Sequence, residues 1–494
     1  MKPFADIHCH PTLHPFAFYD SGNSRKNSLW WDDPPKQRQR NDKYPEFFQS
    51  SMPALARGNV RLVVASMYPL EQPWFDPAIT GKGFITDLMS GLFTAHLPLK
   101  YINKVQSSEF DYFEHLIKEY RFLLKENGTP HLVNNKSRRY ILPESADDIS
   151  EHADDESAII VIPSIEGAHS LFSGNANDIN TGNYDFGKLT ENINVIKNLK
   201  HPPLYITLSH HFYNGLCGHS RTIPDGLASF LIKQNTGMNE PVNSRGEEVV
   251  DHLLGLGKYE NTGRRVLIDV KHTSTASRMW LYEKISALNS GLPREERIPL
   301  IASHCGYSGY HTLKDAIVVP DTEASKYERS VSLNPWSINL TDEDVINIFN
   351  SGGLIGVILD QRVLSGKRVT DRSKEFSKRE IFRNDENIVK FWTLQIAENI
   401  LGMVKAVVDS DEISAEDKLK CWDIFSIGSD FDGMINPVDS FIVADEFKDL
   451  RSALKRYMPE LSDFELCSQG LTVDEILDKI MYDNALEFVL RNYR

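Results

Sequence analysis

Residues 4–10 read Phe-Ala-Asp-Ile-His-Cys-His, and this stretch predicts both a buried strand and a candidate metal site. On a β-strand, side chains at positions i and i+2 point to the same face, so His8 and His10 lie together while Cys9 points to the opposite face. Two imidazoles on one face can hold one divalent ion. The heptapeptide therefore predicts a first strand that carries metal ligands at its end.

Seven later segments share the short, apolar character of this one. The eight predicted strands are 4–8, 61–68, 158–166, 204–210, 265–272, 298–304, 354–360 and 424–430. Most are continuous apolar runs, which are typical of parallel strands covered on both sides, and helix-like stretches such as 244–257 and 385–408 lie between them. Periodicity does not distinguish a closed barrel from an open sheet, but a count of eight favours an α/β fold of the (β/α)8 TIM-barrel type.

The connections between the predicted strands are uneven in length. About ninety residues separate the second strand from the third, and residues 20–56 are rich in Asn, Asp, Pro, Arg and Gln. We interpret 20–56 and 70–157, including the polar segment 126–140, as helical and loop insertions at the C-terminal face of the barrel. The prediction is one barrel domain spanning 1–494, because a large α/β domain with insertions can absorb a chain of this length.

Composition excludes several classes of protein. The chain is 41% hydrophobic and 25% charged, as in ordinary globular proteins, and its net charge of -15 disfavours nucleic acid as a partner. Neither a secretory signal nor a membrane-spanning segment is recognisable, so we expect a cytoplasmic protein without a membrane partner. Five scattered cysteines without a CxxC pair argue against a disulfide framework and a thiolate zinc site.

Potential ligands and proton carriers gather where the predicted strands end. Six of the eight strands contribute His8 with His10, Glu166, His210, His272, His304 and Asp430. TIM-barrel enzymes build their active sites at the C-terminal ends of the strands, so these side chains are expected to converge. Any one of the histidines taken alone is more readily explained as a buried structural residue.

The motifs around these residues resemble those of a known family. Residues 158–170 (AIIVIPSIEGAHS), 265–274 (RVLIDVKHTS), 301–304 (IASH), 339–344 (NLTDED) and 427–433 (IGSDFDG) are similar, in order and spacing, to motifs of the renal or membrane dipeptidases. These form metallopeptidase family M19 of the amidohydrolase superfamily. The similarity extends to residues 480–485 near the C-terminus and does not cover the insertions at 20–56, 70–157 and 171–200.

The resemblance implies a metal-dependent hydrolase that cleaves the amide bond of a dipeptide or N-acyl amino acid by attack of a metal-bridging hydroxide. It implies two divalent metal ions, Zn²⁺ or alternatively Mn²⁺, Fe²⁺ or Co²⁺. Two metals would share Glu166, with His8 and His10 on one and His272 and His304 on the other. By the same resemblance Asp430 would carry the proton and His210 would polarise the substrate carbonyl.

Two positions depart from the family pattern. The family has aspartate at the position of His10, and replacing an anionic ligand by a neutral one raises the charge of the site by one unit. The family also has an arginine that binds the substrate carboxylate where this chain has Ile338, and an aliphatic side chain cannot form that ion pair. Arg221, Arg329 and Arg362 are candidate replacements from loops.

Several neighbouring residues are expected to act indirectly. Asp6 and Asp269 precede ligand histidines and can orient them within the barrel wall. Loop or supporting roles are expected for His14, His169, His219 and Asp432.

Two other functions stay open from the sequence. One is another hydrolysis within the same superfamily, of a lactone, cyclic amide or phosphoester. The other is a catalytically silent metal-binding protein, against which the retention of Asp430 beside the ligands argues. The sequence does not report oligomeric state, and a homodimer is compatible with it.

Overall fold

The computed structural model describes residues 2–35, 47–75, 97–223, 234–318, 332–378 and 384–493. Parts of both predicted insertions, 36–46 and 76–96, and the candidate Arg329 lie outside these residues.

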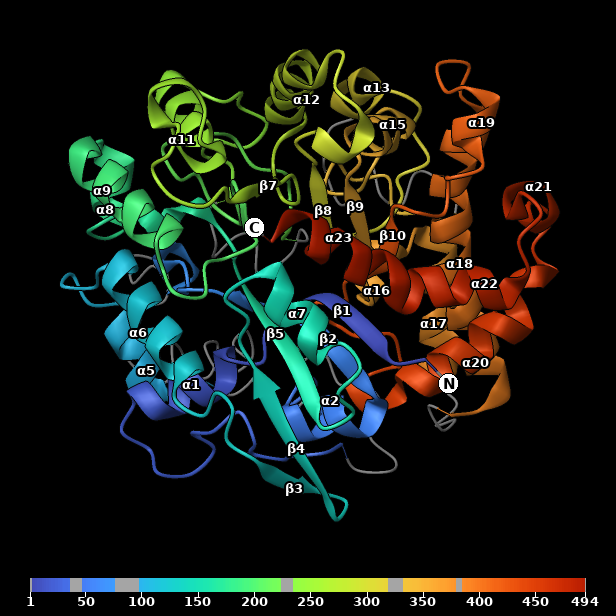
Figure 1. Ribbon diagram of the computed structural model, residues 1–494, viewed down its shortest axis with the longest axis horizontal. Helices are drawn as coiled ribbons and strands as arrows, with labels where there is room; N and C mark the ends of the chain where they lie inside the picture. The colour runs from blue at the N-terminus through green and yellow to red at the C-terminus, as the bar shows by residue number, and fades with distance from the viewer. Residues whose placement is uncertain are drawn as a thin grey trace.

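Eight parallel strands follow one another around a barrel in the order of the chain (Figure 1). They are β1 (Phe4–Cys9), β2 (Val60–Met67), β5 (Ala158–Ile165), β6 (Tyr205–Thr207), β7 (Leu267–Asp269), β8 (Ile301–Cys305), β9 (Leu354–Val357) and β10 (Phe425–Ile427). The backbone N–H of Asp430 donates to His8 O at 2.9 Å and that of His10 donates to Phe431 O at 2.8 Å, so the chain after β10 returns to β1. The predicted TIM barrel is confirmed.

Helices cover the outside of the barrel (Figure 1). They are α1 (Leu13–Asp20), α2 (Met52–Gly58), α5 (Leu99–Val105), α6 (Tyr112–Leu124), α7 (Ala146–His152), α8 (Ala176–Thr181), α9 (Phe186–Lys197), α11 (Ser244–Leu254), α12 (Thr275–Asn289), α13 (Leu313–Val318), α15 (Asp342–Ser351), α16 (Gln361–Leu364), α17 (Lys367–Lys378), α18 (Glu386–Asp409), α19 (Ala415–Lys418), α20 (Phe447–Tyr457), α21 (Phe464–Ser468), α22 (Val473–Asp478) and α23 (Asn484–Asn492).

The last helix, α23, closes the end of the barrel opposite the predicted site. Its Phe488 and Val489 belong to one buried cluster with the first residues of several strands, such as Leu267, Ile301 and Leu354. In Figure 1 this helix crosses in front of the strands. Because apolar side chains fill this end, ligands can approach only from the C-terminal ends of the strands.

One part of the 70–157 insertion differs from the prediction. Residues within 126–141 form a hairpin of β3 (His131–Val133) and β4 (Lys136–Ile141), and β4 pairs with the first residues of β5, away from that strand's C-terminal end. Asn134 and Asn135 both have positive φ, 49° and 60°, as a two-residue hairpin turn requires. The strands escaped prediction because they are short, largely polar and partly exposed, so they lack an apolar run.

Two strands contain an extra residue next to a predicted ligand. Between Asp6 and Cys9, β1 has one more residue than the facing part of β2, and β8 has one more than β9 between Ala302 and Cys305. Such β-bulges bend a strand and re-aim a side chain. The bulges contain His8 and His304, respectively.

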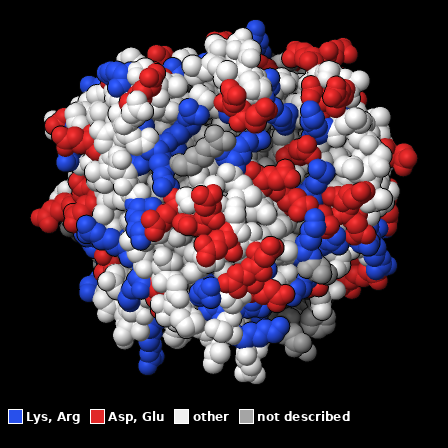
Figure 2. Space-filling model, in the orientation of Figure 1, with Lys and Arg blue, Asp and Glu red and all other residues white. Residues whose placement is uncertain are grey.

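Two features of the described residues are the length of their helices and the distribution of their surface charge. No helix among them is both long and apolar enough to cross a bilayer. Acidic and basic side chains intermingle over the face seen in Figure 2, with no broad patch of one sign.

Candidate metal centre

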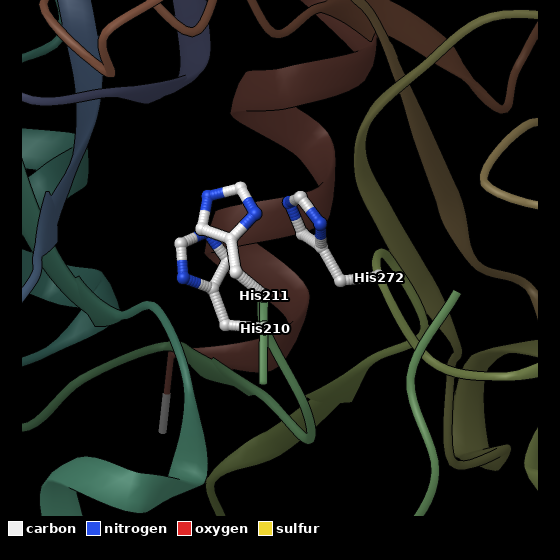
Figure 3. A group of neighbouring side chains, drawn as sticks. All are labelled: His210, His211 and His272. Atoms are coloured by element: carbon white, nitrogen blue, oxygen red, sulfur yellow. The ribbon is translucent and has the colours of Figure 1, made fainter. Parts of the chain in front are cut away.

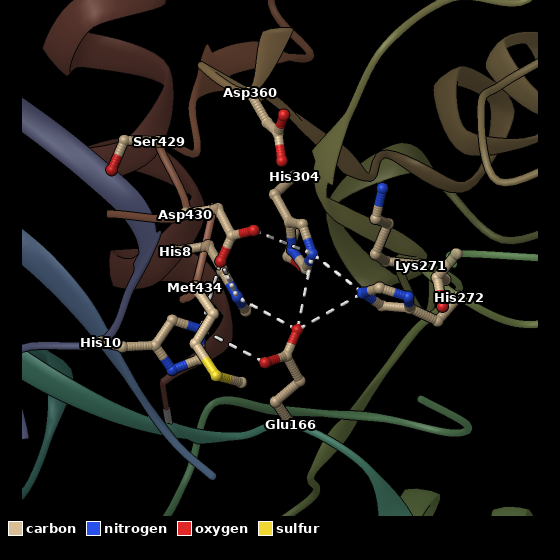
Figure 4. Close-up of polar contacts among 12 residues, drawn as sticks. His8, His10, Glu166, Lys271, His272, His304, Asp360, Ser429, Asp430 and Met434 are labelled. Atoms are coloured by element: carbon tan, nitrogen blue, oxygen red, sulfur yellow. Dashed lines mark hydrogen bonds and ion pairs between the residues drawn. The ribbon is translucent and has the colours of Figure 1, made fainter. Parts of the chain in front are cut away.

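The seven side chains predicted from the strand ends come together at the C-terminal mouth of the barrel. Figure 4 labels all of them except His210, which is labelled in Figure 3. They are His8, His10, Glu166, His210, His272, His304 and Asp430, and the exposed fraction of each is 8% or less. Glu166 lies in the middle. Its two carboxylate oxygens lie 3.2–3.5 Å from the Nε2 atoms of all five histidines. Residues far apart in the sequence thus share one buried carboxylate.

Asp430 faces the same centre from the segment after β10. Its Oδ1 lies 3.3 Å from His10 Nε2 and 3.8 Å from His8 Nε2, and its Oδ2 lies 4.0 Å from His304 Nε2. Burial raises the pKa of Asp430, although its contact with His10 acts in the opposite direction. A carboxyl group with a raised pKa at this place is suited to exchanging a proton.

Two of these residues adopt a backbone conformation that L-amino acids rarely take. The φ angles of His272 and Asp430 are 62° and 61°, in the left-handed region. Each is held by a hydrogen bond: Ser220 N–H donates to His272 O at 2.7 Å, and Asp430 N–H donates to His8 O at 2.9 Å. Strain of about 1–3 kcal/mol per residue persists where the surroundings enforce it, and such residues cluster at functional sites.

Tyr205 determines which nitrogen of His8 faces Glu166. The Tyr205 hydroxyl donates its single hydrogen to Ile7 O at 2.7 Å, so it must accept from His8 Nδ1 at 2.9 Å. The lone pair of His8 then lies on Nε2, which is buried and has no hydrogen-bond partner among the described residues. A lone pair directed at a carboxylate is unfavourable unless a cation lies between them.

His304 is oriented by an equivalent relay. Ser303 Oγ donates to Asp269 Oδ2 at 2.7 Å and therefore accepts from His304 Nδ1 at 2.8 Å. The Thr207 hydroxyl also donates to Asp269, at 2.7 Å. Asp269 thus orients a ligand, as the sequence suggested, but it acts on His304 through Ser303.

Glu71 is a site residue that the sequence analysis missed. Its Oε2 accepts from His210 Nδ1 at 2.8 Å, and its Oε1 accepts from Phe212 N–H at 3.1 Å. Burial lowers the pKa of His210, but Glu166 and Glu71 outweigh burial and raise it above its ordinary value. Its position could have indicated this role, because Glu71 is an acidic residue three positions after the end of the second predicted strand, 61–68.

His211 adds a third imidazole next to His210 and His272 (Figure 3). Ligand atoms of these three residues lie within 4.8 Å of one another. The Nδ1 atom of His211 is paired with Thr222 Oγ1 at 2.7 Å. The described residues thus contain an additional set of donor atoms at the edge of the main cluster.

The neighbouring residues expected to act indirectly have structural partners. Asp6 accepts from Ser429 N–H at 2.9 Å and joins β1 to the segment after β10. Asp432 accepts from the backbone N–H of Ser50 at 2.8 Å and anchors that loop.

The three histidines expected in supporting roles also have partners. His169 Nε2 pairs with Pro69 O at 2.8 Å, and His219 Nδ1 pairs with Ser220 O at 3.0 Å. His14 Nε2 lies 4.0 Å from Asp432 Oδ1.

The arginines proposed to replace the one missing at Ile338 are already engaged where they are described. Arg362 forms an ion pair with Asp360 at 2.6 Å. Arg221 donates to Ile223 O at 3.1 Å and lies 5.7 Å from the centre of the Trp336 ring. Ile338 itself is buried, with 6% of its surface exposed.

The donor set fits divalent metal ions. Two groups of buried donors, His8 with His10 and Glu166, and Glu166 with His272 and His304, each have their ligand atoms within 4.8 Å of one another. Burial raises the pKa of Glu166, but the surrounding imidazoles outweigh burial and hold it well below its usual value. The ionised carboxylate and the Nε2 atoms of His8 and His10, which have no hydrogen-bond partner among the described residues, make a donor set suited to cations.

Comparisons with known proteins extend the fold assignment. No family profile and no curated protein sequence matches the chain. Among solved structures, dipeptidase AC, a metallopeptidase of family M19, aligns with a TM-score of 0.50 and 12% identity over 100% of this chain and 99% of that one. A metallopeptidase from Rhodobacter sphaeroides, solved with a phosphinate mimic of the dipeptide L-Ala-D-Ala, aligns with a TM-score of 0.53 and 11% identity, covering 100% and 99%. The chain therefore shares the fold of these structures.

Proposed function

We propose that this protein is a metal-dependent hydrolase of the M19 dipeptidase type, acting on the amide bond of a dipeptide or N-acyl amino acid. One observation carries the proposal: a buried carboxylate, Glu166, is surrounded by five imidazole Nε2 atoms at 3.2–3.5 Å, with the Asp430 carboxyl beside them. The shared fold with M19 structures supports it.

The residues would hold two metals in two overlapping groups. His8, His10 and Glu166 form one, and Glu166, His272 and His304 form the other. Such ions, most simply Zn²⁺, acidify a water molecule and polarise a carbonyl oxygen. Tyr205 and Ser303 hold two of the histidines with Nε2 toward the centre, so the ligands are arranged before a metal arrives.

Asp430 is the proposed proton carrier. It would take a proton from the attacking water at a carboxylate oxygen and deliver it to the leaving nitrogen. Its φ of 61° and the bond from its N–H to His8 O fix the carboxyl against the histidine cluster.

His210 is proposed to stabilise the developing oxyanion. Its Nδ1 is bonded to Glu71, so only a protonated imidazole can donate from Nε2. Because Glu71 and Glu166 raise the pKa of His210, they favour that protonated form. A donor placed where negative charge develops lowers the barrier.

The test combines metal analysis with one substitution. Purified protein, loaded with Zn²⁺, Mn²⁺ or Co²⁺, is assayed on dipeptides and N-acyl amino acids. We expect Asp430→Asn to retain its metal and lose about 10²–10⁴-fold in kcat, whereas Asp411→Asn on the exposed surface retains full activity. Protein that neither binds metal nor hydrolyses an amide after loading would contradict the proposal.

A second candidate is a different superfamily hydrolysis, of a lactone, cyclic amide or phosphoester. Ile338 favours it, because an aliphatic side chain stands where M19 enzymes are expected to bind the substrate carboxylate. Turnover of substrates without a carboxylate, together with no turnover of dipeptides, would select this candidate.

A further inference from the structure

Lys271 is a buried cation beside the metal centre that the proposed mechanism does not use. Only 2% of its surface is exposed, and its ammonium group has no hydrogen-bond partner among the described residues. It precedes the ligand His272 directly. Burying an unpaired ammonium costs several kcal/mol, so such a group usually has an anionic partner in the functional state.

Lys271 lies in the turn that directly follows β7 at the mouth of the barrel. Leu267 and Asp269 of β7 face inward: the first packs in the cluster closed by α23, and the second bonds Thr207 and Ser303 of the neighbouring strands. Lys271 follows two residues later, in the turn 270–273 that ends β7, where Thr273 N–H donates to Val270 O at 3.1 Å. Its own backbone N–H donates to Asp269 Oδ1 at 3.1 Å, which joins the turn to that inward-facing carboxylate.

The side chain belongs to the same ring of residues as the metal ligands. Figure 4 shows Lys271 beside His272 and His304, on the part of the ring that also contains Asp360. Burial lowers the pKa of His304, and the positive charge of Lys271 lowers it further. The ammonium therefore acts electrostatically on His304, one member of the second group of ligands.

The residues so far considered for binding the substrate carboxylate are unsuited to it or already engaged. Ile338 cannot bind a carboxylate, and Arg362 is paired with Asp360 at 2.6 Å. Arg221 lies against Trp336 and donates to Ile223 O. Lys271 differs from both arginines because its donors are unsatisfied.

We infer that Lys271 binds the carboxylate of the substrate, next to the scissile amide, on the His272 and His304 side of the centre. This inference rests on the proposed amide hydrolysis and names the residue of this chain that would recognise the free carboxylate of its substrate. The carboxylate would satisfy the ammonium donors with charge-assisted hydrogen bonds, in place of the family's arginine.

The experiment compares a carboxylate substrate with its neutral counterpart. Wild type and Lys271→Met, both loaded with Zn²⁺, are assayed on an alanyl dipeptide and on the same dipeptide with a C-terminal amide. We expect wild type to prefer the free acid, and Lys271→Met to lose about 10- to 100-fold in kcat/KM for the acid with little change for the amide. Lys258→Met, on the exposed surface, is the matched control.

A binding measurement keeps the inference testable without turnover. Calorimetry of the zinc-loaded protein should show that wild type binds alanine more tightly than alaninamide and that Lys271→Met does not discriminate. Retained preference for the acid in Lys271→Met, or its loss in Arg221→Met instead, would overturn the inference. So would equal binding of acid and amide by wild type.

These outcomes separate the two proposals. If wild type hydrolyses neither substrate but Lys271→Met abolishes the discrimination in binding, the amide hydrolase proposal fails and the carboxylate site stands. If wild type hydrolyses both dipeptides and Lys271→Met behaves like wild type, only the role of Lys271 fails. Metal content and thermal unfolding of each variant establish that it is folded and loaded.

Discussion

Tyr205 contacts the candidate metal centre through a hydrogen bond to His8. Its ring is buried, and its hydroxyl bridges His8 Nδ1 and the Ile7 carbonyl at 2.9 and 2.7 Å. The Nε2 lone pair of His8 faces the centre because of this bridge. Removing a hydrogen-bond partner of a metal-binding histidine commonly lowers metal affinity by about 10- to 100-fold.

We expect Tyr205→Phe to weaken zinc binding by about 10- to 100-fold, because the ring stays packed while His8 loses the group that selects its tautomer. Competition with a chromogenic chelator measures the affinity. Tyr19→Phe, at an exposed position, serves as the control. Equal affinities of wild type and Tyr205→Phe would show that the hydroxyl does not orient the ligand.

Glu71 sets the protonation of His210, so its effect should appear in the pH profile. The raised pKa of His210 means that the protonated form persists to higher pH and is lost as pH rises through the folded-state value. We expect Glu71→Gln to shift the alkaline limb of kcat to lower pH and to reduce kcat by about tenfold or more at neutral pH. Steady-state kinetics from pH 5 to pH 9 measure both effects.

Glu248→Gln, on the surface, provides the comparison for this substitution. An unchanged alkaline limb in Glu71→Gln would remove His210 protonation from the mechanism, whatever happened to the absolute rate.

Helix α6 shows how an inserted element is joined to the barrel. Glu119 accepts from the Thr12 hydroxyl at 2.6 Å and from Tyr68 N–H at 3.2 Å, next to the ends of β1 and β2. One turn earlier, buried His115 is bonded to the Tyr101 hydroxyl at 2.9 Å and packs among aromatic rings. The helix thus stabilises the barrel mouth, and its polar groups respond to pH.

His115 predicts a loss of stability in acid. Burial lowers its pKa from 6.5 to about 3, so below pH 6.5 the unfolded chain takes up a proton that the folded chain does not. This group should therefore cost about 2 kcal/mol of unfolding free energy between pH 7 and pH 5. Chemical unfolding at both pH values should show a smaller loss for His115→Gln than for wild type.

His152→Gln, on the partly exposed α7, is the control for that comparison. If wild type and His115→Gln lost equal stability between the two pH values, His115 would not be responsible for the acid sensitivity.

At the scale of the whole molecule, the candidate metal centre is also a structural junction. Its residues come from β1 and β8 and from the segments that follow β1, β5, β6, β7 and β10, whereas the opposite end of the barrel is filled by apolar side chains under α23. A metal bound at the centre therefore links strands from most of the barrel.

Metal removal should consequently lower the stability of the whole barrel. A ligand that binds only the folded state adds about 2.7 kcal/mol at a concentration of 100 times its Kd. We expect chelator treatment to lower the calorimetric melting temperature and Zn²⁺ to restore it. His8→Asn combined with His304→Asn should melt at the same temperature with and without chelator. A wild-type melting temperature that changes with neither chelator nor Zn²⁺ would show that metal does not stabilise the barrel.

The sequence by itself determined the barrel and the main members of the site. Continuous apolar runs such as 158–166 report strands because burial on both faces admits few polar residues. The ligands were visible because parallel strands place their C-terminal ends together, so polar residues at those ends must converge. The hairpin of β3 and β4 could not be predicted from the sequence, because a partly exposed strand does not require an apolar run.

The tertiary structure alone decided how those side chains work. The tautomer of His8 depends on Tyr205, and the charge of His210 depends on Glu71, residues that are 197 and 139 positions away in the chain. The lack of a partner for Lys271 also follows only from knowing what surrounds it. Hydrogen bonds and electrostatic interactions depend on distances in space, and a sequence records neighbours along the chain but not these distances.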